Sequence, residues 1–264
     1  MNFSELLKIA INASFKGGQA IMKVYDSEFA VEHKADKSPL TLADKNCNAV
    51  IDSFLKKTNL PILSEEGAKT PYLVRKKWEY SWLVDPLDGT KEFVKRNGEF
   101  TVNIALIYKG NPIMGVIYVP VKEDLYFSLE GIGSYKKSGC SKCIDNVENL
   151  ISESISLPIF SKRDSYVIVG SRSHMSKETE EFINQKKQEY GDVEVISVGS
   201  SLKLCMVAEG KADSYPRYAP TMEWDTAAGD AICRMAGFQV LQFNSEKPVE
   251  YNKEDLLNPW FLVK

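Results

Sequence analysis

Two aspartates, Asp85 and Asp88, lie in a short segment whose residue types are typical of a metal and phosphate site. The segment, residues 82–93, reads WLVDPLDGTKEF. Carboxylate oxygens are the usual ligands of hard divalent cations. Gly89 lets a backbone N–H come close to a ligand, and Thr90 adds a hydroxyl at a predicted helix start, where phosphate binds. A polar turn with an N-cap is the alternative explanation, because Asp, Gly and Thr are common in turns.

The residues around these aspartates predict how they are positioned. We expect Val84 to end a buried strand and Pro86 to prevent further pairing, because proline has no N–H to donate. Asp85 and Asp88 should then emerge at the edge of the sheet, where loops often carry function.

Three other segments carry acidic residues at predicted element ends. The apolar strand 60–63 is followed by Glu65 and Glu66, an adjacent pair that is unfavourable unless a cation is near or one side chain points into solvent. A solvated loop after the strand is the alternative. Thr41 is a predicted helix N-cap, which makes Asp44, one turn further on, the more informative position.

The third of these segments begins a helix of small residues, and we expect Asp225 to be its N-cap. Capping is compatible with a second role only if one carboxylate oxygen stays free. Small residues at 227–229 should let this helix pack close to a neighbour.

Four carboxylates in one pocket would repel one another by several kcal/mol unless cations neutralised them. Convergence of Glu65, Asp85, Asp88 and Asp225 would therefore imply bound Mg²⁺. Oxygen ligands without nearby His or Cys favour Mg²⁺ over Zn²⁺. The sequence alone does not show that the four segments meet.

The composition is that of a folded globular chain with no general affinity for polyanions. Its 264 residues suffice for one large or two ordinary domains, and 44% hydrophobic with 26% charged residues argues against disorder. A net charge of -3 excludes a global basic field for nucleic acid or an anionic membrane. Any phosphate affinity must therefore be local.

The N-terminus and the cysteines predict a cytoplasmic protein. Residues 1–20 have no basic leader region, and Lys8 and Asn12 interrupt the apolar run, so neither a signal peptide nor a membrane span is expected. Peripheral association with the inner membrane stays an alternative, although no anchor is visible. Five scattered cysteines argue against a disulfide scaffold. Cys140 and Cys143 form a C-x-x-C without a second pair, so we favour an exposed loop over a metal or redox site.

The order of predicted elements indicates two halves, 1–150 and 151–264, with a boundary between Ser138 and Leu157. The first half has helices near 1–25, capped by Ser4, and 41–57, then the strands of a mostly antiparallel sheet. Residues 109–112 are a predicted hairpin turn between two of these strands. From about 150, strands and helices alternate, which suggests an α/β unit. The oligomeric state is open.

The motifs SEEG, DPLDGT and WDTAAG, in this order, resemble those of the lithium-sensitive, Mg²⁺-dependent phosphomonoesterases related to inositol monophosphatase. The match spans nearly the whole chain. Within that superfamily, LVDPLDGTKEFVKRNGEFTVNIALI, VGSSLKLCMVAEGKADSYPRYAPTMEWDTAAG and LNPWF resemble the CysQ-type 3'(2'),5'-bisphosphate nucleotidases. The resemblance implies a mixed α and β fold, a layered αβαβα sandwich of the inositol monophosphatase and fructose-1,6-bisphosphatase type. It also implies hydrolysis of 3'-phosphoadenosine 5'-phosphate to AMP and phosphate, a reaction of sulfur assimilation.

The resemblance also implies roles for individual residues. The expected ligands of two or three Mg²⁺ ions are Glu65, Asp85, Asp88, Asp225 and the carbonyl of Leu87. Thr90 with Glu65, or Thr90 with Asp44, would orient and deprotonate the attacking water, without a covalent phosphoenzyme. Backbone N–H groups at Gly89 and Thr90 would hold the phosphate.

The small-molecule nucleotide would contact four further residues and Asp225. These four are His174, Ser200, Lys203 and Arg217. The two cations suit a bisphosphate, which carries charge that metal ions leave unneutralised. Ordinary surface chemistry is the alternative for each residue, and Lys203 in particular fits a side chain that packs its stem on apolar surface.

Two other functions compete with this interpretation. A phosphatase for inositol or sugar phosphates would need the same carboxylates and no nucleotide pocket. A nucleotide sensor without catalysis would be expected to lack a ligand or the water-orienting hydroxyl, and here all are present.

Overall fold

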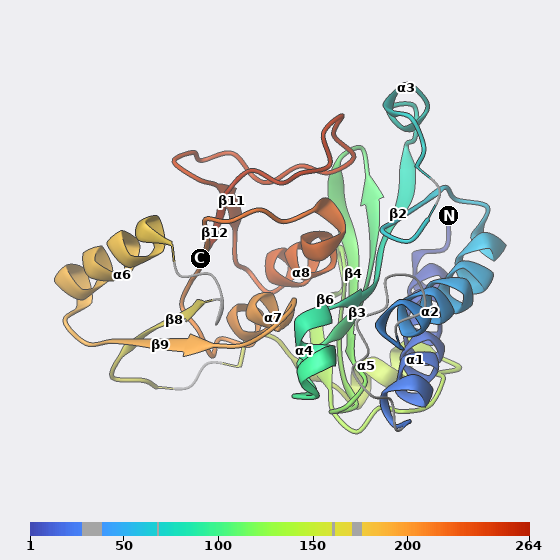
Figure 1. The fold of residues 1–264 in the computed structure, drawn as a ribbon, viewed down its shortest axis with the longest axis horizontal. Coiled ribbons are helices and arrows are strands. Elements are labelled where there is room, and N and C mark those ends of the chain that lie inside the picture. Colours follow the sequence, from blue (N-terminus) through green and yellow to red (C-terminus); the bar gives the residue numbers. More distant parts are fainter. Residues whose placement is uncertain (28–38, 68, 160–161, 171–175) are drawn as a thin grey trace.

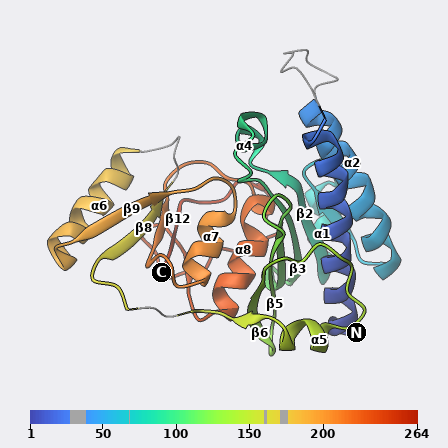
Figure 2. The ribbon, with the colours of Figure 1, turned by 90° about the horizontal axis from the view of Figure 1, so that it is seen from below.

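The computed structural model describes residues 1–27, 39–67, 69–159, 162–170 and 176–264. These residues form five layers, in the order helices, sheet, helices, strands and helix (Figure 1). The view from below shows the same succession (Figure 2). The layered mixed fold expected from the sequence is confirmed.

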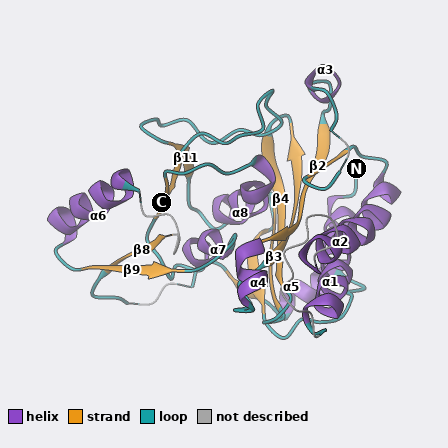
Figure 3. Ribbon diagram, viewed as in Figure 1, coloured by secondary structure: helices purple, strands orange, loops and turns teal. Residues whose placement is uncertain are grey.

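The elements run as follows (Figure 3). The helices are α1 (Phe3–Tyr25), α2 (Pro39–Leu55), α3 (Tyr72–Arg75), α4 (Thr90–Lys95), α5 (Val147–Ser152), α6 (Lys177–Tyr190), α7 (Leu202–Ala208) and α8 (Glu223–Met235), with the short 3-10 helix η1 (Lys56–Thr58). The strands are β1 (Ile62–Ser64), β2 (Tyr80–Asp88), β3 (Thr101–Tyr108), β4 (Asn111–Val119), β5 (Asp124–Leu129), β6 (Gly133–Lys137), β7 (Ile155–Ser156), β8 (Tyr166–Gly170), β9 (Val193–Ser197), β10 (Tyr215–Arg217), β11 (Val240–Gln242) and β12 (Phe261–Val263).

The first layer is the packed helix pair α1 and α2, which covers one face of the large sheet (Figure 1). The expected apolar face of α1 is buried, with Leu7, Ile11 and Phe15 at most 1% exposed. Its N-cap is Asn2, whose side chain accepts from the Glu5 N–H, so the predicted cap at Ser4 was wrong. Ser4 is the second residue of the helix instead.

The predicted cap of the second helix was also wrong, because α2 already begins at Pro39 and Thr41 lies in its first turn. Proline is favoured in the first turn of a helix, where its missing N–H has no partner to lose. Asp44 keeps a place near the N-terminal end of α2.

The second layer is a seven-stranded sheet in the order β1 to β7, in which only β1 and β2 pair in parallel. The predicted hairpin is present, since β3 and β4 pair through a two-residue turn. Lys109 and Gly110 both have positive φ there, the conformation that two-residue hairpin turns require.

The strand that carries the two central aspartates is longer than predicted. β2 does not end at Val84, because Asp85 still pairs with Asn103, and Asp88 pairs with Thr101. Three steps on β2 therefore match two on β3, which is a bulge at Pro86 and Leu87. A bulge is one of the places where a sheet tolerates proline.

The third layer consists of α7 and α8, which cover the other face of the sheet. Glycine lets α8 pack closely against its neighbours, as predicted from the small residues at 227–229. A Cβ on Gly229 would lie 2.5 Å from Leu204 Cδ1 of α7. On the sheet, a Cβ on Gly115 would overlap the carbonyl oxygen of Ala228.

The outer layers belong to the second half of the chain. Strands β8 and β9 pair in parallel, β12 lies between β10 and β11, and α6 covers the outside. The strand β7 joins the large sheet at β6, so the sheet extends past residue 150. The division of the chain at that residue stays a prediction.

Two observations bear on the expected cellular setting. Among the described residues, no helix is long and apolar enough to cross a bilayer. All five cysteines are free thiols, with Cys140 buried and Cys143 exposed.

Candidate active site

Three of the predicted carboxylates meet at one point between the large sheet and α8. Glu65, Asp85 and Asp225 each place a carboxylate oxygen within 4.8 Å of the other two. They come from three elements: Glu65 follows β1, Asp85 lies in β2 and Asp225 lies in the first turn of α8. The Glu65 N–H donates to the Val84 carbonyl at 3.2 Å, which holds the end of β1 against β2.

Asp88 belongs to the same group of charges. The bulge in β2 brings Asp88 back into register with β3, and its Oδ2 accepts a hydrogen bond of 2.8 Å from the Ser201 hydroxyl. Its charge raises the pKa of Asp85, Glu65 and Asp225, after the larger effect of burial in each case. The structure therefore brings together all four carboxylates that the sequence singled out.

The described residues leave much of this negative charge uncompensated. Burial, and then the charge of Asp88, raises the pKa of Asp225 to about 7. Burial raises the pKa of Asp85 well above its usual range, with the charges of Asp88 and Asp225 next in importance. The pKa values of Glu65, Asp85 and Asp225 are therefore all raised, as expected where buried acids lie close together with too little positive charge around them.

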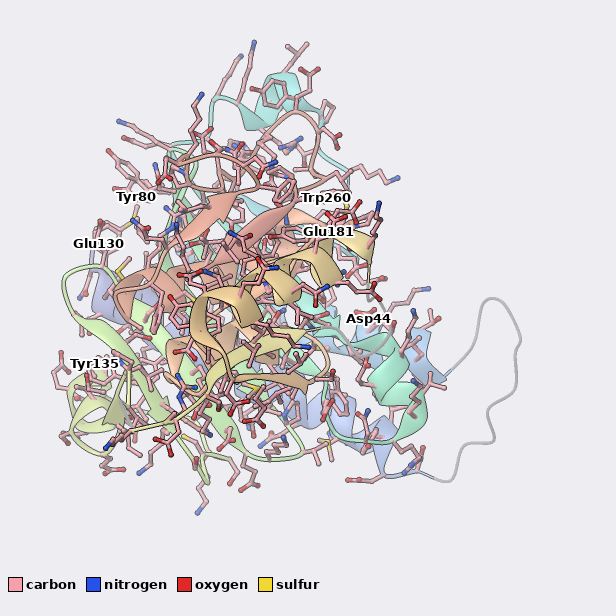
Figure 4. All side chains as sticks on the ribbon, turned by 90° about the vertical axis from the view of Figure 1, so that its left-hand side faces the viewer. Asp44, Tyr80, Glu130, Tyr135, Glu181 and Trp260 are labelled. Carbon is pink, nitrogen blue, oxygen red and sulfur yellow. The ribbon has the colours of Figure 1, made fainter. Side chains whose placement is uncertain are left out.

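Asp44 adds a fifth acid beside this cluster. Its side chain is buried, and Oδ1 has no hydrogen-bond partner among the described residues. Burial, followed by the charges of Glu66 and Glu65, raises its pKa to about 7. Figure 4 labels Asp44 on α2, the helix that contacts α4. Unpartnered carboxylate oxygens among other acids are what hard divalent cations require, so the residues fit such ions.

The capping role expected for Asp225 takes a different form. The N-cap of α8 is Met222, and Asp225 stands three residues later, where its Oδ2 accepts from the Met222 N–H at 2.8 Å. A carboxylate at this position satisfies the exposed N–H from inside the helix. Only one oxygen is used, so Asp225 both stabilises the helix start and keeps Oδ1 for the site.

The bulge residue Leu87 is held by the site itself. Its N–H donates to Oδ1 of Asp85 at 3.0 Å across Pro86. The Pro86 carbonyl accepts from the buried Cys47 thiol of α2 at 3.1 Å. These two contacts fix the backbone between the aspartates, while the role of the Leu87 carbonyl as a ligand stays a prediction.

A cleft of about 200 Å³ opens next to the acids. Gly89 and Thr90 line it at the start of α4. Gly89 has a φ of 93°, and a Cβ there would lie 3.0 Å from the Glu99 carbonyl oxygen and 3.1 Å from Ser200 Cβ. Only glycine fits both the conformation and the space.

A second part of the cleft wall carries three of the residues expected to bind the nucleotide. Ser200, Lys203 and Arg217 line it together with Asp88 and Asp225. The Ser200 hydroxyl and the Arg217 Nε are buried and have no hydrogen-bond partner among the described residues. His174, the fourth predicted contact, lies outside the described residues.

Lys203 is almost fully buried in this wall. Its Nζ donates to the Ser200 carbonyl at 2.6 Å and lies 5.7 Å from the ring centre of Tyr215. Burial lowers its pKa to about 8, against the opposing effect of the Asp88 charge. The wall therefore places a cation at the cleft beside the acidic cluster.

The sequence interpretation missed three residues of the site. Lys91 lines the cleft directly after Thr90. Ser201 and Asn103 form buried hydrogen bonds behind Asp88. Asn103 offered a signal, since it is a polar residue inside the otherwise apolar strand β3. Ser201 offered little, because the adjacent Ser200 has the same residue type.

Comparison with known proteins places the chain in a family. The profile of the inositol monophosphatase family matches residues 2–260. The chain is 44% identical over 264 residues to the 3'(2'),5'-bisphosphate nucleotidase CysQ of Escherichia coli K12, covering 98% of each. The crystal structure of CysQ from Bacteroides thetaiotaomicron, described as a bacterial member of the inositol monophosphatase family, superposes with a TM-score of 0.96 at 53% identity, covering 100% of this chain and 98% of that one.

A more distant solved structure shares the fold alone. An inositol monophosphatase from Zymomonas mobilis has a TM-score of 0.75 at 17% identity, covering 100% of this chain and 93% of that one. The protein described here belongs to the inositol monophosphatase family.

Proposed function

We propose that the protein is a Mg²⁺-dependent 3'(2'),5'-bisphosphate nucleotidase that hydrolyses 3'-phosphoadenosine 5'-phosphate to AMP and phosphate. The observation that carries this proposal is that acidic and cationic side chains line one cleft. Asp88 and Asp225 line the cleft together with Lys203 and Arg217. Glu65 and Asp85 each place a carboxylate oxygen within 4.8 Å of one of Asp225. The choice of substrate is supported by curated relatives that are 44% identical and are named 3'(2'),5'-bisphosphate nucleotidase CysQ.

The acids would hold two or three Mg²⁺ ions, with the Leu87 carbonyl as a further ligand. Such ions, when bound, stabilise charge on the phosphoryl oxygens and lower the pKa of water. Mg²⁺ is the natural choice because all the candidate ligands are oxygens.

The residues of the chain would then carry out three tasks. The Thr90 hydroxyl orients the attacking water, and the carboxylate of Glu65 or Asp44 accepts its proton. The N–H groups of Gly89 and Thr90 hold the 3'-phosphate. Attack by water on phosphorus breaks the bond to the 3'-oxygen, which leaves as the hydroxyl of AMP after it takes up a proton. This in-line displacement needs no covalent intermediate.

Recognition of the second phosphate falls to the second part of the cleft wall. The Nε of Arg217 has no hydrogen-bond partner in the part of the chain that the structure describes, and a guanidinium binds phosphate with charge-assisted hydrogen bonds. Lys203 supplies a second positive charge, and the Ser200 hydroxyl, unpartnered among the described residues, supplies a donor. His174 and Asp225 complete the proposed set of contacts with the nucleotide.

The contribution of this wall is tested by comparing two substrates. Wild-type protein should hydrolyse 3'-phosphoadenosine 5'-phosphate with a higher kcat/KM than 3'-AMP, which lacks the 5'-phosphate. Arg217→Met should lose most of this preference through a higher KM for the bisphosphate, about 10- to 100-fold for one desolvated charged contact. An Arg163→Met variant is the matched control, because Arg163 binds Lys211 and Asp213 away from the cleft. Equal preference in wild type and Arg217→Met would contradict the assignment.

A further inference from the structure

The hydroxyl of Ser201 makes three contacts beside the acidic cluster. It lies 2.8 Å from Oδ2 of Asp88 and 2.8 Å from the backbone carbonyl oxygen of Asp225. It also accepts from Nδ2 of Asn103 at 2.9 Å. Ser201 is 3% exposed and Asn103 is 1% exposed, so water does not compete for these contacts.

The types of these groups fix where the hydroxyl proton lies. A carboxylate and a backbone carbonyl only accept, whereas the amide Nδ2 of Asn103 only donates. The single proton of Ser201 therefore lies on the side of Asp88 Oδ2 and the Asp225 carbonyl oxygen, of which the charged carboxylate is the stronger acceptor, while the oxygen lone pair receives the Asn103 N–H. Asn103 thus holds Ser201 in the donating orientation.

The same contacts join three elements that each carry part of the site. Asn103 lies in β3 and pairs with Asp85 in the sheet. Ser201 lies directly before α7, and Asp225 lies in the first turn of α8. This buried hydroxyl therefore connects the sheet, which carries Asp85 and Asp88, to the start of α8, which carries Asp225.

We propose that Ser201 is a positioning residue for the cation site, and that Asn103 positions Ser201. The Ser201 hydroxyl engages Oδ2 of Asp88 and so leaves Oδ1 to bind the cation in a fixed orientation. This inference rests on the proposed function, because it takes Asp88 to be a ligand. Partners behind a metal ligand commonly set its orientation, and their removal weakens metal binding by 10–100-fold.

Binding of Mg²⁺ to the nucleotide-free protein tests the proposal without reference to turnover. Isothermal titration calorimetry should show about tenfold weaker Mg²⁺ affinity for Ser201→Ala than for wild type. Ser201→Cys nearly preserves the volume but donates poorly, and it should show a similar loss. The metal concentration for half-maximal phosphate release should shift in parallel.

The matched control is Ser14→Ala. Ser14 is fully buried and its hydroxyl donates to the Ile11 carbonyl at 2.8 Å within α1. Ser14→Ala removes another fully buried hydroxyl, far from the acids in the chain, and should leave Mg²⁺ affinity unchanged. A general loss of packing would move both variants alike.

The outcomes separate this inference from the proposed function. Wild-type protein that binds Mg²⁺, together with Ser201 variants of equal affinity, would overturn the positioning role alone. Wild-type protein that binds no Mg²⁺, or that hydrolyses no bisphosphate nucleotide, would overturn the proposed function and this inference with it. Weaker binding in both Ser201 variants, but not in Ser14→Ala, is the result that we expect.

Discussion

The guanidinium of Arg75 donates a hydrogen bond of 2.7 Å to Oδ1 of Asn252, a residue 177 positions further along the chain. Asn252 returns one bond, from Nδ2 to the Arg75 carbonyl at 2.9 Å, and its own N–H donates to the fully buried Glu223. Arg75 ends α3 in the loop after Glu65, and Glu223 begins α8. The C-terminal segment therefore links the loop that follows one predicted ligand to the helix that carries another.

Replacing Arg75 should destabilise the protein through this link. Arg75→Met keeps an apolar stem but leaves Asn252 Oδ1 and two carbonyl groups without their donor. We expect a loss of about 1–3 kcal/mol in the free energy of unfolding, the range for buried groups left without hydrogen bonds. Urea denaturation at fixed Mg²⁺ measures it. Lys109→Met, at an exposed ion pair with Glu79, is the control and should change it by less than about 0.5 kcal/mol. Equal stability of both variants would refute the importance of the link.

The packing of α8 on the sheet gives a second prediction. A Cβ on Gly115 would overlap the Ala228 carbonyl oxygen and lie 2.9 Å from Ala231 Cβ, so Gly115→Ala must push α8 outward. We expect destabilisation of about 1–3 kcal/mol from overpacking, with weaker Mg²⁺ binding because Asp225 moves with the helix. Thermal unfolding and calorimetry measure the two effects.

A second strand glycine provides the comparison for this change. A Cβ on Gly170 would meet no heavy atom within 4 Å among the described residues. Gly170→Ala should therefore leave both stability and Mg²⁺ affinity close to those of wild type. If Gly115→Ala behaved in the same way, α8 would not be held by direct contact with the sheet.

The raised pKa values predict how stability depends on pH and metal. Burial raises the pKa of Asp44 and Asp225 from 3.8 to about 7, so the folded state binds their protons more tightly than the unfolded state. Their contribution to stability is fully present below about pH 4 and is lost as pH rises through 7. The unfolding temperature of metal-free protein should fall over this interval.

Mg²⁺ should reverse this loss, because the cations bind the deprotonated carboxylates. We expect a larger increase in unfolding temperature on addition of Mg²⁺ at pH 8 than at pH 5.5. Differential scanning fluorimetry with and without chelator measures both conditions. An equal increase at the two pH values would contradict metal binding by acids with raised pKa values.

Several parts of the fold and site followed from local sequence patterns. Apolar periodicity located α1, and the Lys109–Gly110 turn located the β3–β4 hairpin, because both signals depend on neighbouring residues. The strand end at Val84 was wrong because the sequence does not show a bulge, which depends on the partner strand. The position of Asp225 differed for a similar reason, since Met222 takes the cap.

Long-range contacts explain what the sequence did not predict. The bonds between Asn103, Ser201 and Asp88 join residues about a hundred positions apart in the chain, and no spacing rule connects them. The meeting of Glu65 and Asp225 was expected only through the family resemblance. In the structure these residues meet because α8, which carries Asp225, packs on the large sheet, and Glu65 follows a strand of that sheet.

Phosphate release from 3'-phosphoadenosine 5'-phosphate, measured with and without Mg²⁺ beside inositol monophosphate, tests the central claim most directly. We expect Mg²⁺-dependent release with a clear preference for the nucleotide. Asp88→Asn should fold but lose most turnover, because it removes one charge from a cleft and leaves the core intact. A preference for inositol monophosphate, or near-normal turnover by folded Asp88→Asn protein, would contradict the account.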